Sequence, residues 1–443
     1  MNLEASAVVR WLAPLVREPG EVADALVERR REAVLTWRDG EVVETRFAST
    51  EALSARWQRG GRQLLSGVST ADEAGLREAL RDLQVALGRP VLPIKPGRVG
   101  SSEEESPSPS VERWRKRLSA LLARHAPRHR LRFTLAEISR DVFPASGAAV
   151  SHARRLLSLE GSFRAASRRG DEERAFSFHG PESETLAEEL KAFLVRSAEP
   201  REASMPCPEG ETAAVLAGGS AVVLFHEILS HPLEAGASSP LSGLATARVA
   251  VAELHVRDDA TRLDLFGGYE ADDEGVSPQP VKLLDAGRLA GRLTNRAHAA
   301  RMGRDPSNGH GRRAEAADAP LPRGSNLVVA AGGATREEMQ RRLGTGLWIE
   351  DFDAGSVELA SGSFRLRFPR ARRVRRGRLA DELGPGILAG EILPALGGVE
   401  TGLGRETHAY RALGWCARAG QVVAVQGAAP DVLIRGLQVR GLA

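Results

Sequence analysis

The chain has 443 residues, of which 42% are hydrophobic and 27% charged, so it is long enough for two or three globular domains. Its 61 Lys and Arg residues nearly balance its 58 Asp and Glu residues, and the formal net charge of +3 argues against a nucleic-acid partner. Two cysteines exclude a disulfide framework, and no apolar run approaches the roughly 20 residues that cross a membrane, so we expect a cytoplasmic protein.

The first 90 residues predict a helix, two strands and a second helix. The N-terminal stretch MNLEASAVVRWLAPLVREPGE lacks a basic segment followed by an unbroken apolar core, so it does not resemble a signal peptide. Residues 22–31 have the spacing of an amphipathic helix. The β-type runs 33–37 and 42–47 flank Asp39-Gly40, a pair that is typical of a tight hairpin turn. A helix at about 71–87 follows.

The next hundred residues predict a linker and further helices. Residues 96–112 are rich in Pro, Ser, Gly and Glu and have little to bury, which predicts a flexible linker or exposed loop. Helical patterns cover about 112–125 and 184–196, and a weaker strand signal lies at 175–179. We therefore expect an N-terminal α+β domain over residues 1–200.

The second half consists of short Val-, Leu- and Ile-rich runs separated by glycines, for example at 281–291, 356–362 and 421–427. This pattern predicts hairpins in a large antiparallel sheet. The basic run 367–378 has strand-like spacing and indicates a solvated strand face. The predicted fold class is α+β, with an N-terminal α/β region followed by a β-rich C-terminal domain over 201–443. No GxGxxG, P-loop or GxSxG motif is present.

Residues 225–231, FHEILSH, place two histidines and a glutamate directly after an apolar run. Imidazoles can bind zinc, and a carboxylate can accept the proton of the attacking water in a hydrolytic site. On a regular α-helix, however, His226 and His231 lie roughly 140° apart and cannot reach one ion. One wide turn of π-helix would bring them to the same face. Without that turn, His226 is a buried core histidine and His231 ends the helix before Pro232.

A third metal ligand has to come from elsewhere in the chain, and spacing alone does not choose it. Cys416 lies in a glycine-flanked segment before a predicted strand, but a single cysteine is more often a small buried residue than a ligand. Cys207 lies between two prolines and gives no metal signal.

An ordered set of motifs over residues 205–443 resembles the TldD/PmbA family of zinc metalloproteases. HEILSH resembles the family's HExxxH motif. Five further segments match family segments in order and rough spacing: DDEG at 272–275, GHGRR at 309–313, LPRGSN at 321–326, ASGSF at 360–364 and GWCARAGQ at 414–421. The set is far more specific than any one of its members.

The resemblance implies a role for each matching residue. The family's two motif histidines and C-terminal cysteine bind the metal, which implies Zn²⁺ ligands at His226, His231 and Cys416. The family's motif glutamate implies that Glu227 is the general base. The resemblance further implies unfolded or small peptides as substrates, with the active site enclosed in a dimer of two copies or of this chain and a metal-less sister subunit.

The expected function is a zinc-dependent peptidase that uses metal-activated water, with the metal-site helix carried by the large sheet. A peptide could add as an extended strand to an exposed edge of that sheet. The alternative is a non-catalytic, metal-containing peptide-binding or assembly subunit of a TldD/PmbA-type complex. A closed four-ligand site would favour this alternative.

The chain departs from the family pattern within and after the motif. Where the family usually has small residues and a glycine within the motif, this chain has Ile228, Leu229 and Ser230. The acidic residue that ends the family's next segment has no counterpart in residues 232–237. We expect these departures to affect substrate range more than metal binding. Further oxyanion contacts could come from His310, Arg312 and Arg313, although exposed arginines are the commoner case.

Overall fold

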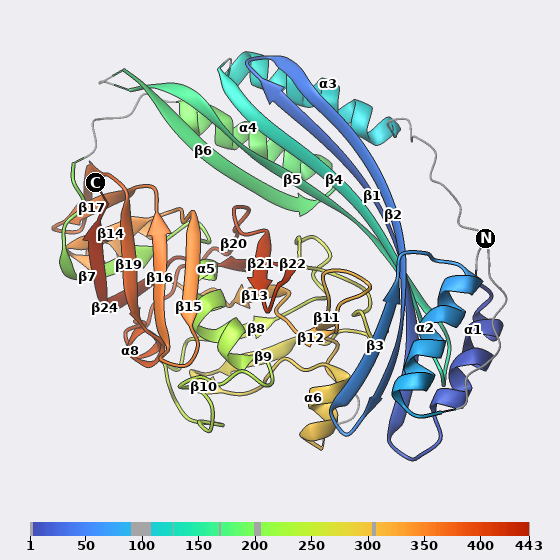
Figure 1. The fold of residues 1–443 in the computed structure, drawn as a ribbon. Coiled ribbons are helices and arrows are strands. Elements are labelled where there is room, and N and C mark those ends of the chain that lie inside the picture. Colours follow the sequence, from blue (N-terminus) through green and yellow to red (C-terminus); the bar gives the residue numbers. More distant parts are fainter. Residues whose placement is uncertain are drawn as a thin grey trace.

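The computed structural model describes residues 3–89, 108–126, 128–167, 170–198, 205–303 and 307–442. The chain folds as a mixed α+β structure in which one long curved sheet lies beside two shorter sheets (Figure 1). Most strand pairs are antiparallel, whereas β7 pairs with β14 and β13 with β23 in parallel. The predicted fold class is confirmed. Among the described residues, no helix is both long and apolar enough to cross a membrane.

The N-terminal sheet has six strands in the order β3-β2-β1-β4-β5-β6. Its longest strand has 19 residues. The strands are β1 (Glu21–Arg38), β2 (Glu41–Arg59), β3 (Arg62–Val68), β4 (His129–Pro144), β5 (Val150–Ser167) and β6 (Gly170–Pro181).

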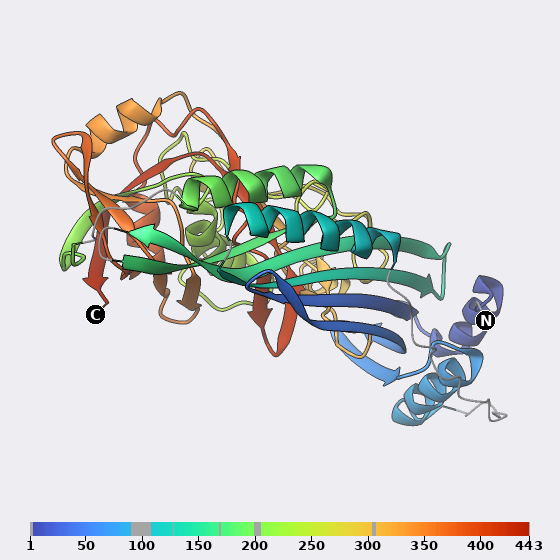
Figure 2. The same cartoon turned by 90° about the horizontal axis from the view of Figure 1, so that it is seen from above.

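Helices cover one face of this sheet (Figure 2). Side chains alternate between the two faces of a strand, and the odd-numbered Ala23, Ala25, Leu35 and Trp37 of β1 are buried in the two cores beneath these helices. The helices are α1 (Ala5–Leu12), the 3₁₀ turn η1 (Ala13–Leu15), α2 (Glu73–Ala86), α3 (Pro109–His125) and α4 (Glu184–Ala198).

The opposite face of the sheet meets the C-terminal half through buried ion pairs. Asp24 of β1 binds the guanidinium of Arg56, with 3.1 Å between Oδ2 and Nε, and Arg56 also pairs with Glu274. Glu28 binds Arg140, with 2.6 Å between Oε2 and Nε. The helix predicted at 22–31 is therefore wrong, because the acids Asp24 and Glu28 do not face solvent but pair with distant arginines on the buried face of a strand.

Several local predictions are confirmed. Asp39 and Gly40 form the turn between β1 and β2, with φ angles of 49° and 96°. The helices expected at 71–87, 112–125 and 184–196 correspond to α2, α3 and α4. Of the linker predicted at 96–112, the part up to residue 107 lies outside the described residues, and the rest is corrected because α3 begins at Pro109.

The C-terminal half contains two larger sheets. An eight-stranded sheet has the order β15-β16-β19-β24-β7-β14-β17-β18, and a six-stranded sheet has the order β10-β9-β8-β13-β23-β20. The first comprises β7 (Gly210–Leu216), β14 (Gly346–Ile349), β15 (Ala354–Glu358), β16 (Ser363–Phe368), β17 (Ala371–Arg375), β18 (Arg378–Leu383), β19 (Gly386–Glu391) and β24 (Val432–Gly441). The second comprises β8 (Val256–Asp258), β9 (Val281–Asp285), β10 (Arg288–Leu289), β13 (Asn326–Val329), β20 (His408–Ala409) and β23 (Gln426–Ala429).

Two small hairpins and several short helices complete this half. The hairpins are β11–β12 (Gly311–Arg312 with Leu321–Pro322) and β21–β22 (Trp415–Arg418 with Gln421–Ala424). The helices are α5 (Ala221–Phe225), the π-helix η2 (His226–Ser230), the 3₁₀ turn η3 (His231–Leu233), α6 (Arg296–Arg301), α7 (Arg336–Leu343) and α8 (Ile392–Gly397).

The α5–η2 helix lies between the two larger sheets (Figure 1). Val222, Phe225 and Leu229 share one hydrophobic core with Leu327 of the six-stranded sheet and Phe364 of the eight-stranded sheet. Burial on all sides explains why the sequence before the histidine motif is an unbroken apolar run. This packing fixes where the histidine motif can lie.

Candidate metal centre

The wide helical turn that the histidine spacing requires is present. His226–Ser230 form a π-helix, in which the backbone N–H of His231 donates to the carbonyl oxygen of His226 five residues earlier. The two imidazole ring centroids lie 4.6 Å apart. The π turn therefore brings both histidines to the same face of the helix.

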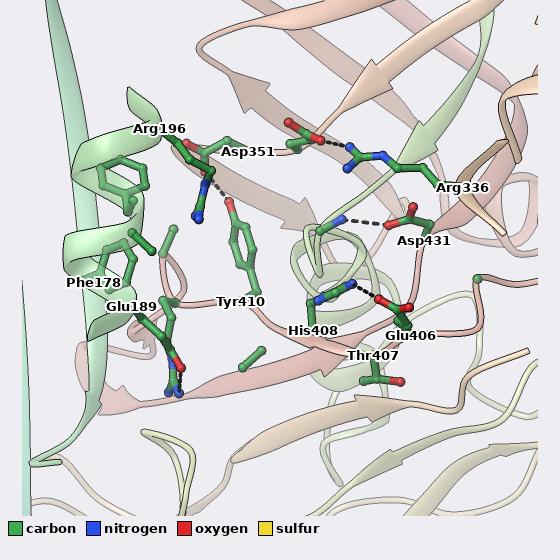
Figure 3. A pocket seen from close by; sticks show the side chains of 18 of the residues that line it. Phe178, Glu189, Arg196, Arg336, Asp351, Glu406, Thr407, His408, Tyr410 and Asp431 are labelled. Atoms are coloured by element: carbon green, nitrogen blue, oxygen red, sulfur yellow. Dashed lines mark hydrogen bonds and ion pairs between the residues drawn. The ribbon is translucent and has the colours of Figure 1, made fainter. Parts of the chain in front are cut away.

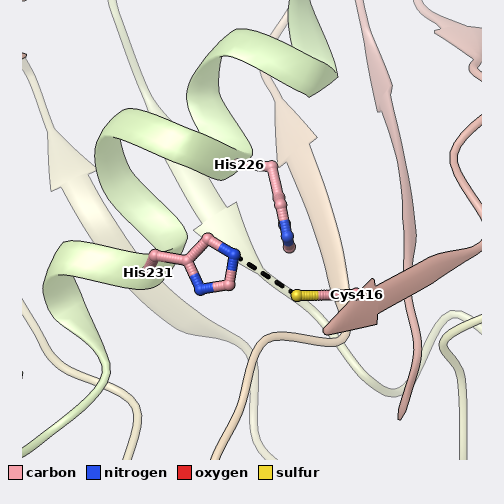
Figure 4. A group of neighbouring side chains, drawn as sticks. All are labelled: His226, His231 and Cys416. Atoms are coloured by element: carbon pink, nitrogen blue, oxygen red, sulfur yellow. Dashed lines mark hydrogen bonds between the residues drawn. The ribbon is translucent and has the colours of Figure 1, made fainter. Parts of the chain in front are cut away.

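Cys416 completes a three-residue cluster with these histidines (Figure 4). It lies on β21, and its Sγ is 3.3 Å from Nε2 of His231. One potential ligand atom from each residue lies within 4.8 Å of the others, and all three residues are buried. Of the residues predicted to hold the metal, the structure brings all three together.

The donor set fits a zinc ion. Zinc binds imidazole nitrogen at about 2.0–2.1 Å and thiolate at about 2.3 Å, so tetrahedral ligand atoms lie roughly 3.5 Å apart. The Sγ–Nε2 distance of 3.3 Å agrees with that separation. In addition, Nε2 of His226 is buried and has no hydrogen-bond partner among the described residues. A buried polar atom without a partner is costly, and a cation would satisfy it.

The surroundings of Cys416 favour its thiolate form. Burial favours the neutral thiol of Cys416, but the electrostatic influence of His226 and His231 outweighs it and holds the pKa well below its usual range. Nη2 of Arg323 also lies 3.2 Å from Sγ and donates to the carbonyl oxygen of Cys416 at 2.7 Å. Because Nη1 donates to the carbonyl oxygen of Gln421 as well, this fully buried arginine binds both strands of the β21–β22 hairpin.

Glu234 lies beside the second histidine and was not predicted as a site residue. Its carboxylate Oε1 lies 3.6 Å from Nδ1 of His231, and its side chain has no solvent exposure. Arg418 pairs with the other carboxylate oxygen, and the backbone N–H of Gly324 donates to Oε1 at 3.1 Å. A carboxylate at the far nitrogen of a ligand imidazole is a common way to orient that ligand. Its position three residues after His231 is the only signal in the sequence.

Glu227 and the three residues of the cluster line one cavity. This cavity has a volume of about 520 Å³. Burial raises the pKa of Glu227, the histidines oppose this shift, and the net pKa lies above its ordinary value. A raised pKa suits a carboxylate that exchanges a proton with substrate near neutral pH. The side chain also packs against Gly355 of β15, since a methyl group added there would lie 3.0 Å from Oε1.

The unusual residues within the motif do not enter the cavity. Ile228 and Leu229 are fully buried in the main core. Ser230 is also fully buried, next to Gly324. These larger residues therefore fill space between the sheets and leave the metal cluster unobstructed.

His310, Arg312 and Arg313 are not exposed, contrary to expectation, and do not line the metal cavity. Each is at most 2% exposed. Nε2 of His310 lies 3.1 Å from Asp258, Arg312 donates to the carbonyl oxygen of Gly324, and Arg313 donates to the carbonyl oxygen of Asp273. Their contacts are those of residues that hold loops together, so they do not supply the oxyanion contacts considered from sequence.

Comparison with known proteins places these features in a wider context. A family model described as the PmbA/TldA metallopeptidase C-terminal domain matches residues 209–441. A protein named as a metalloprotease from Methanothermobacter thermautotrophicus is 29% identical over 240 residues, which are 53% of this chain and 52% of that protein. A protein named as a zinc metalloprotease TldD homolog from Saccharolobus solfataricus is 24% identical over 238 residues, or 52% of each chain.

The match to solved structures extends along almost the whole chain. TldE from Thermococcus kodakarensis superposes with a TM-score of 0.75 at 16% identity, covering 99% of this chain and 100% of that one. At this identity the likeness concerns the fold alone. The chain spans about half the length of the curated relatives it matches in sequence.

Proposed function

The chain belongs to the TldD/PmbA family, and from this premise we propose that it is a zinc-dependent peptidase that hydrolyses unfolded or small peptides. The observation that carries the proposal is the buried cluster of His226, His231 and Cys416 with Glu227 in the same cavity. Three protein ligands leave a position for water, which is typical of catalytic rather than structural zinc sites.

In this proposal the two histidines and the cysteine hold the metal, and the carboxylate of Glu227 moves the proton. When bound, zinc would activate water and polarise the scissile carbonyl. Glu227 accepts the proton of the attacking water and delivers it to the leaving amine. Glu234 and Arg323 keep their respective ligands, His231 and Cys416, in place throughout.

Two free strand edges flank the cavity and can hold an extended peptide. β15 is the last strand of the eight-stranded sheet, and within the described part of the chain it pairs only with β16 and β21 pairs only with β22. Residues 352–357 and 415–418 both line the cavity. Backbone hydrogen bonds to such edges require an extended chain but no particular side chains. This arrangement supports unfolded peptides as the substrate class.

The Glu227→Gln substitution tests the proposal. It keeps the shape of the side chain and removes the proton acceptor, so we expect bound zinc to remain and peptide cleavage to fall by at least about 100-fold. Zinc content and cleavage of an unstructured peptide are measured together, with Glu211→Gln on the exposed part of β7 as the matched control. Full cleavage by the Glu227→Gln protein would refute the mechanism. Zinc retention with no cleavage by the unsubstituted protein would favour the non-catalytic subunit instead.

A further inference from the structure

Trp415 has an exposed indole ring in the wall of the metal cavity. It is 37% exposed, and among the large hydrophobic side chains that are exposed in the described part of the chain it is the only aromatic one. It directly precedes the proposed ligand Cys416 on β21. An exposed tryptophan beside a candidate active site is typical of a binding residue, because its large ring provides much contact area with few rotatable bonds.

A buried aromatic residue holds the indole ring in place. The ring centroid of Trp415 lies 5.0 Å from that of Phe266, and the two ring planes meet at 88°. Phe266 is buried in a core with Ile138 and Leu156 of the N-terminal sheet, and its ring centroid lies 5.4 Å from that of His179. Both halves of the chain thus fix the indole ring before any ligand binds, which lowers the entropy cost of binding.

The cavity wall near Trp415 is largely apolar. Leu413 lies in the same segment of the chain, and Val357 and Leu359 line the cavity from β15 and the residue that follows it. All three side chains are half-buried, so part of their apolar surface is open. Contact with an apolar side chain would remove this surface from water, which is favourable in proportion to the area buried.

The charges of this wall are already engaged. Apart from the metal cluster and the proposed base, the acidic and basic residues that line the cavity are Asp353 and Arg418. Asp353 accepts from Nε of Arg367 at 2.8 Å, and Arg418 pairs with Glu234. Burial lowers the pKa of His179 to about 4, so this lining residue is uncharged near neutral pH. A charged substrate side chain would therefore lose hydration without gaining an available partner.

The neighbouring cavity has a different character (Figure 3). It has a volume of about 920 Å³ and shares Tyr410 and Ala412 with the metal cavity, but its wall carries six acids and five arginines. These charges nearly balance and select no class of ligand. The excess of apolar over charged lining residues therefore belongs to the metal cavity and is not shared by its neighbour.

The geometry of β21 determines which substrate side chain meets Trp415. Successive side chains of a strand point to opposite faces, so Cys416 and Trp415 lie on opposite faces of β21. In an antiparallel pair, residues directly opposite each other share a face, with Cβ atoms about 4.5–5.5 Å apart. In a peptide added to the edge of β21, the residue opposite Cys416 therefore faces the metal cluster, and its neighbour in the peptide faces Trp415.

We propose that Trp415 and the apolar wall around it bind a large apolar side chain of the peptide, one position from the residue that faces the metal. This inference rests on the proposed peptidase function. Folded proteins bury most large apolar side chains, whereas unfolded peptides expose them. Trp415 is therefore a specificity-determining residue, which adds a side-chain preference to backbone recognition along the strand edges.

The test uses short unstructured peptides of Gly, Ser and Thr with one central variable residue, which is Phe, Leu, Ser, Glu or Arg. kcat/KM is measured with the zinc-loaded protein, and the cleaved bond is located by mass spectrometry. Affinity is measured by fluorescence anisotropy with labelled peptides and zinc-loaded Glu227→Gln protein, which leaves the peptides intact.

Each measurement is repeated with Trp415→Ser and with the conservative Trp415→Phe. Val422→Ser is the matched control, because this residue is 48% exposed on the same hairpin and lies outside both cavities. Peptides are compared on one protein sample, so their ratios do not depend on the fraction of protein that holds zinc. The unsubstituted protein alone decides whether the apolar subsite exists, and the variants decide whether Trp415 forms it.

We expect the Phe and Leu peptides to exceed the Ser, Glu and Arg peptides about 10-fold or more in kcat/KM and in affinity, with cleavage at a fixed distance from the apolar residue. Trp415→Ser should lower these ratios about 5-fold or more, Trp415→Phe should keep most of the preference, and Val422→Ser should leave it unchanged.

Equal kcat/KM and equal affinity for all five peptides overturn the apolar subsite while the peptidase function stands. Ratios that are unchanged after Trp415→Ser overturn the role of Trp415. A binding preference that Trp415→Ser reduces, without any cleavage by the unsubstituted protein, supports the subsite and refutes the peptidase function.

Discussion

The residues of the proposed metal site differ in how much the sequence reveals of them. His226 and His231 follow from the motif, and Cys416 follows only from the ordered set of family segments, because 185 residues separate it from His231. Glu234 could not be predicted, since one glutamate after a proline looks like any surface acid. Only the fold shows that this carboxylate has no solvent exposure and lies 3.6 Å from His231.

The Glu234→Gln substitution should weaken zinc binding about 10- to 100-fold. Glutamine keeps the volume of the side chain but removes the negative charge that orients and polarises the imidazole of His231. Zinc affinity is measured by competition with a chelator, at a temperature where circular dichroism shows the protein to be folded. Glu400→Gln, which removes a solvent-accessible partner of Arg435, is the control. An unchanged zinc affinity after Glu234→Gln would show that the carboxylate does not support the ligand.

At the scale of single elements, the structure explains one wrong prediction. The spacing at 22–31 fits an amphipathic helix because Asp24 and Glu28 lie four residues apart with apolar residues between them. In the fold both acids face the C-terminal half and pair with Arg56 and Arg140. Local sequence cannot report such partners, which lie 32 and 112 residues away. The Asp39–Gly40 turn was predictable because its backbone requirement is local.

The contact between β15 and the π-helix gives a second prediction, because Gly355 lies against Glu227, the proposed general base. A methyl group added at Gly355 would lie 3.0 Å from both Oε1 of Glu227 and Cγ1 of Val223, which is closer than ordinary van der Waals contact. Gly355→Ala should therefore displace the carboxylate and lower kcat about 10- to 100-fold, with zinc content unchanged.

Cleavage rate and zinc content are measured side by side for this substitution. Gly333→Ala is the matched control, since a methyl group there meets no atom within 4 Å. If Gly355→Ala protein cleaves peptides at the normal rate, the close packing of β15 on Glu227 has no part in positioning the base.

For the whole molecule, stability depends on the buried seam of ion pairs between the N-terminal sheet and the C-terminal half. Arg56 and Arg140, on β2 and β4, pair across this seam with Glu274 and Asp273. Removing one member of a buried pair typically costs about 3–5 kcal/mol, because the other charge stays buried. The seam therefore stabilises the contact between the two halves while its acids remain ionised and its arginines paired.

His152 lies at this seam and makes stability depend on pH. Burial lowers the pKa of His152 to about 4, with Arg154 and Arg140 adding to the shift and Asp273 opposing it. In the unfolded chain a histidine titrates near its ordinary value of about 6.5. Between these two values the unfolded state binds one more proton than the folded state. The free energy of unfolding therefore falls as the pH falls through this window, by about 2 kcal/mol from this residue at pH 5.

His152→Gln removes this titration and should make the free energy of unfolding less dependent on pH. Urea unfolding is measured at pH 7.5 and pH 5 in the presence of a chelator, because zinc release at low pH would otherwise add to the change. The difference between the two pH values should be smaller by about 2 kcal/mol in the variant. Protonation of the paired acids of the seam lowers the free energy of unfolding of both proteins alike. The comparison between the two proteins therefore isolates the effect of the histidine. An identical pH dependence in the two proteins would mean that His152 takes up its proton as readily in the fold as in the unfolded chain.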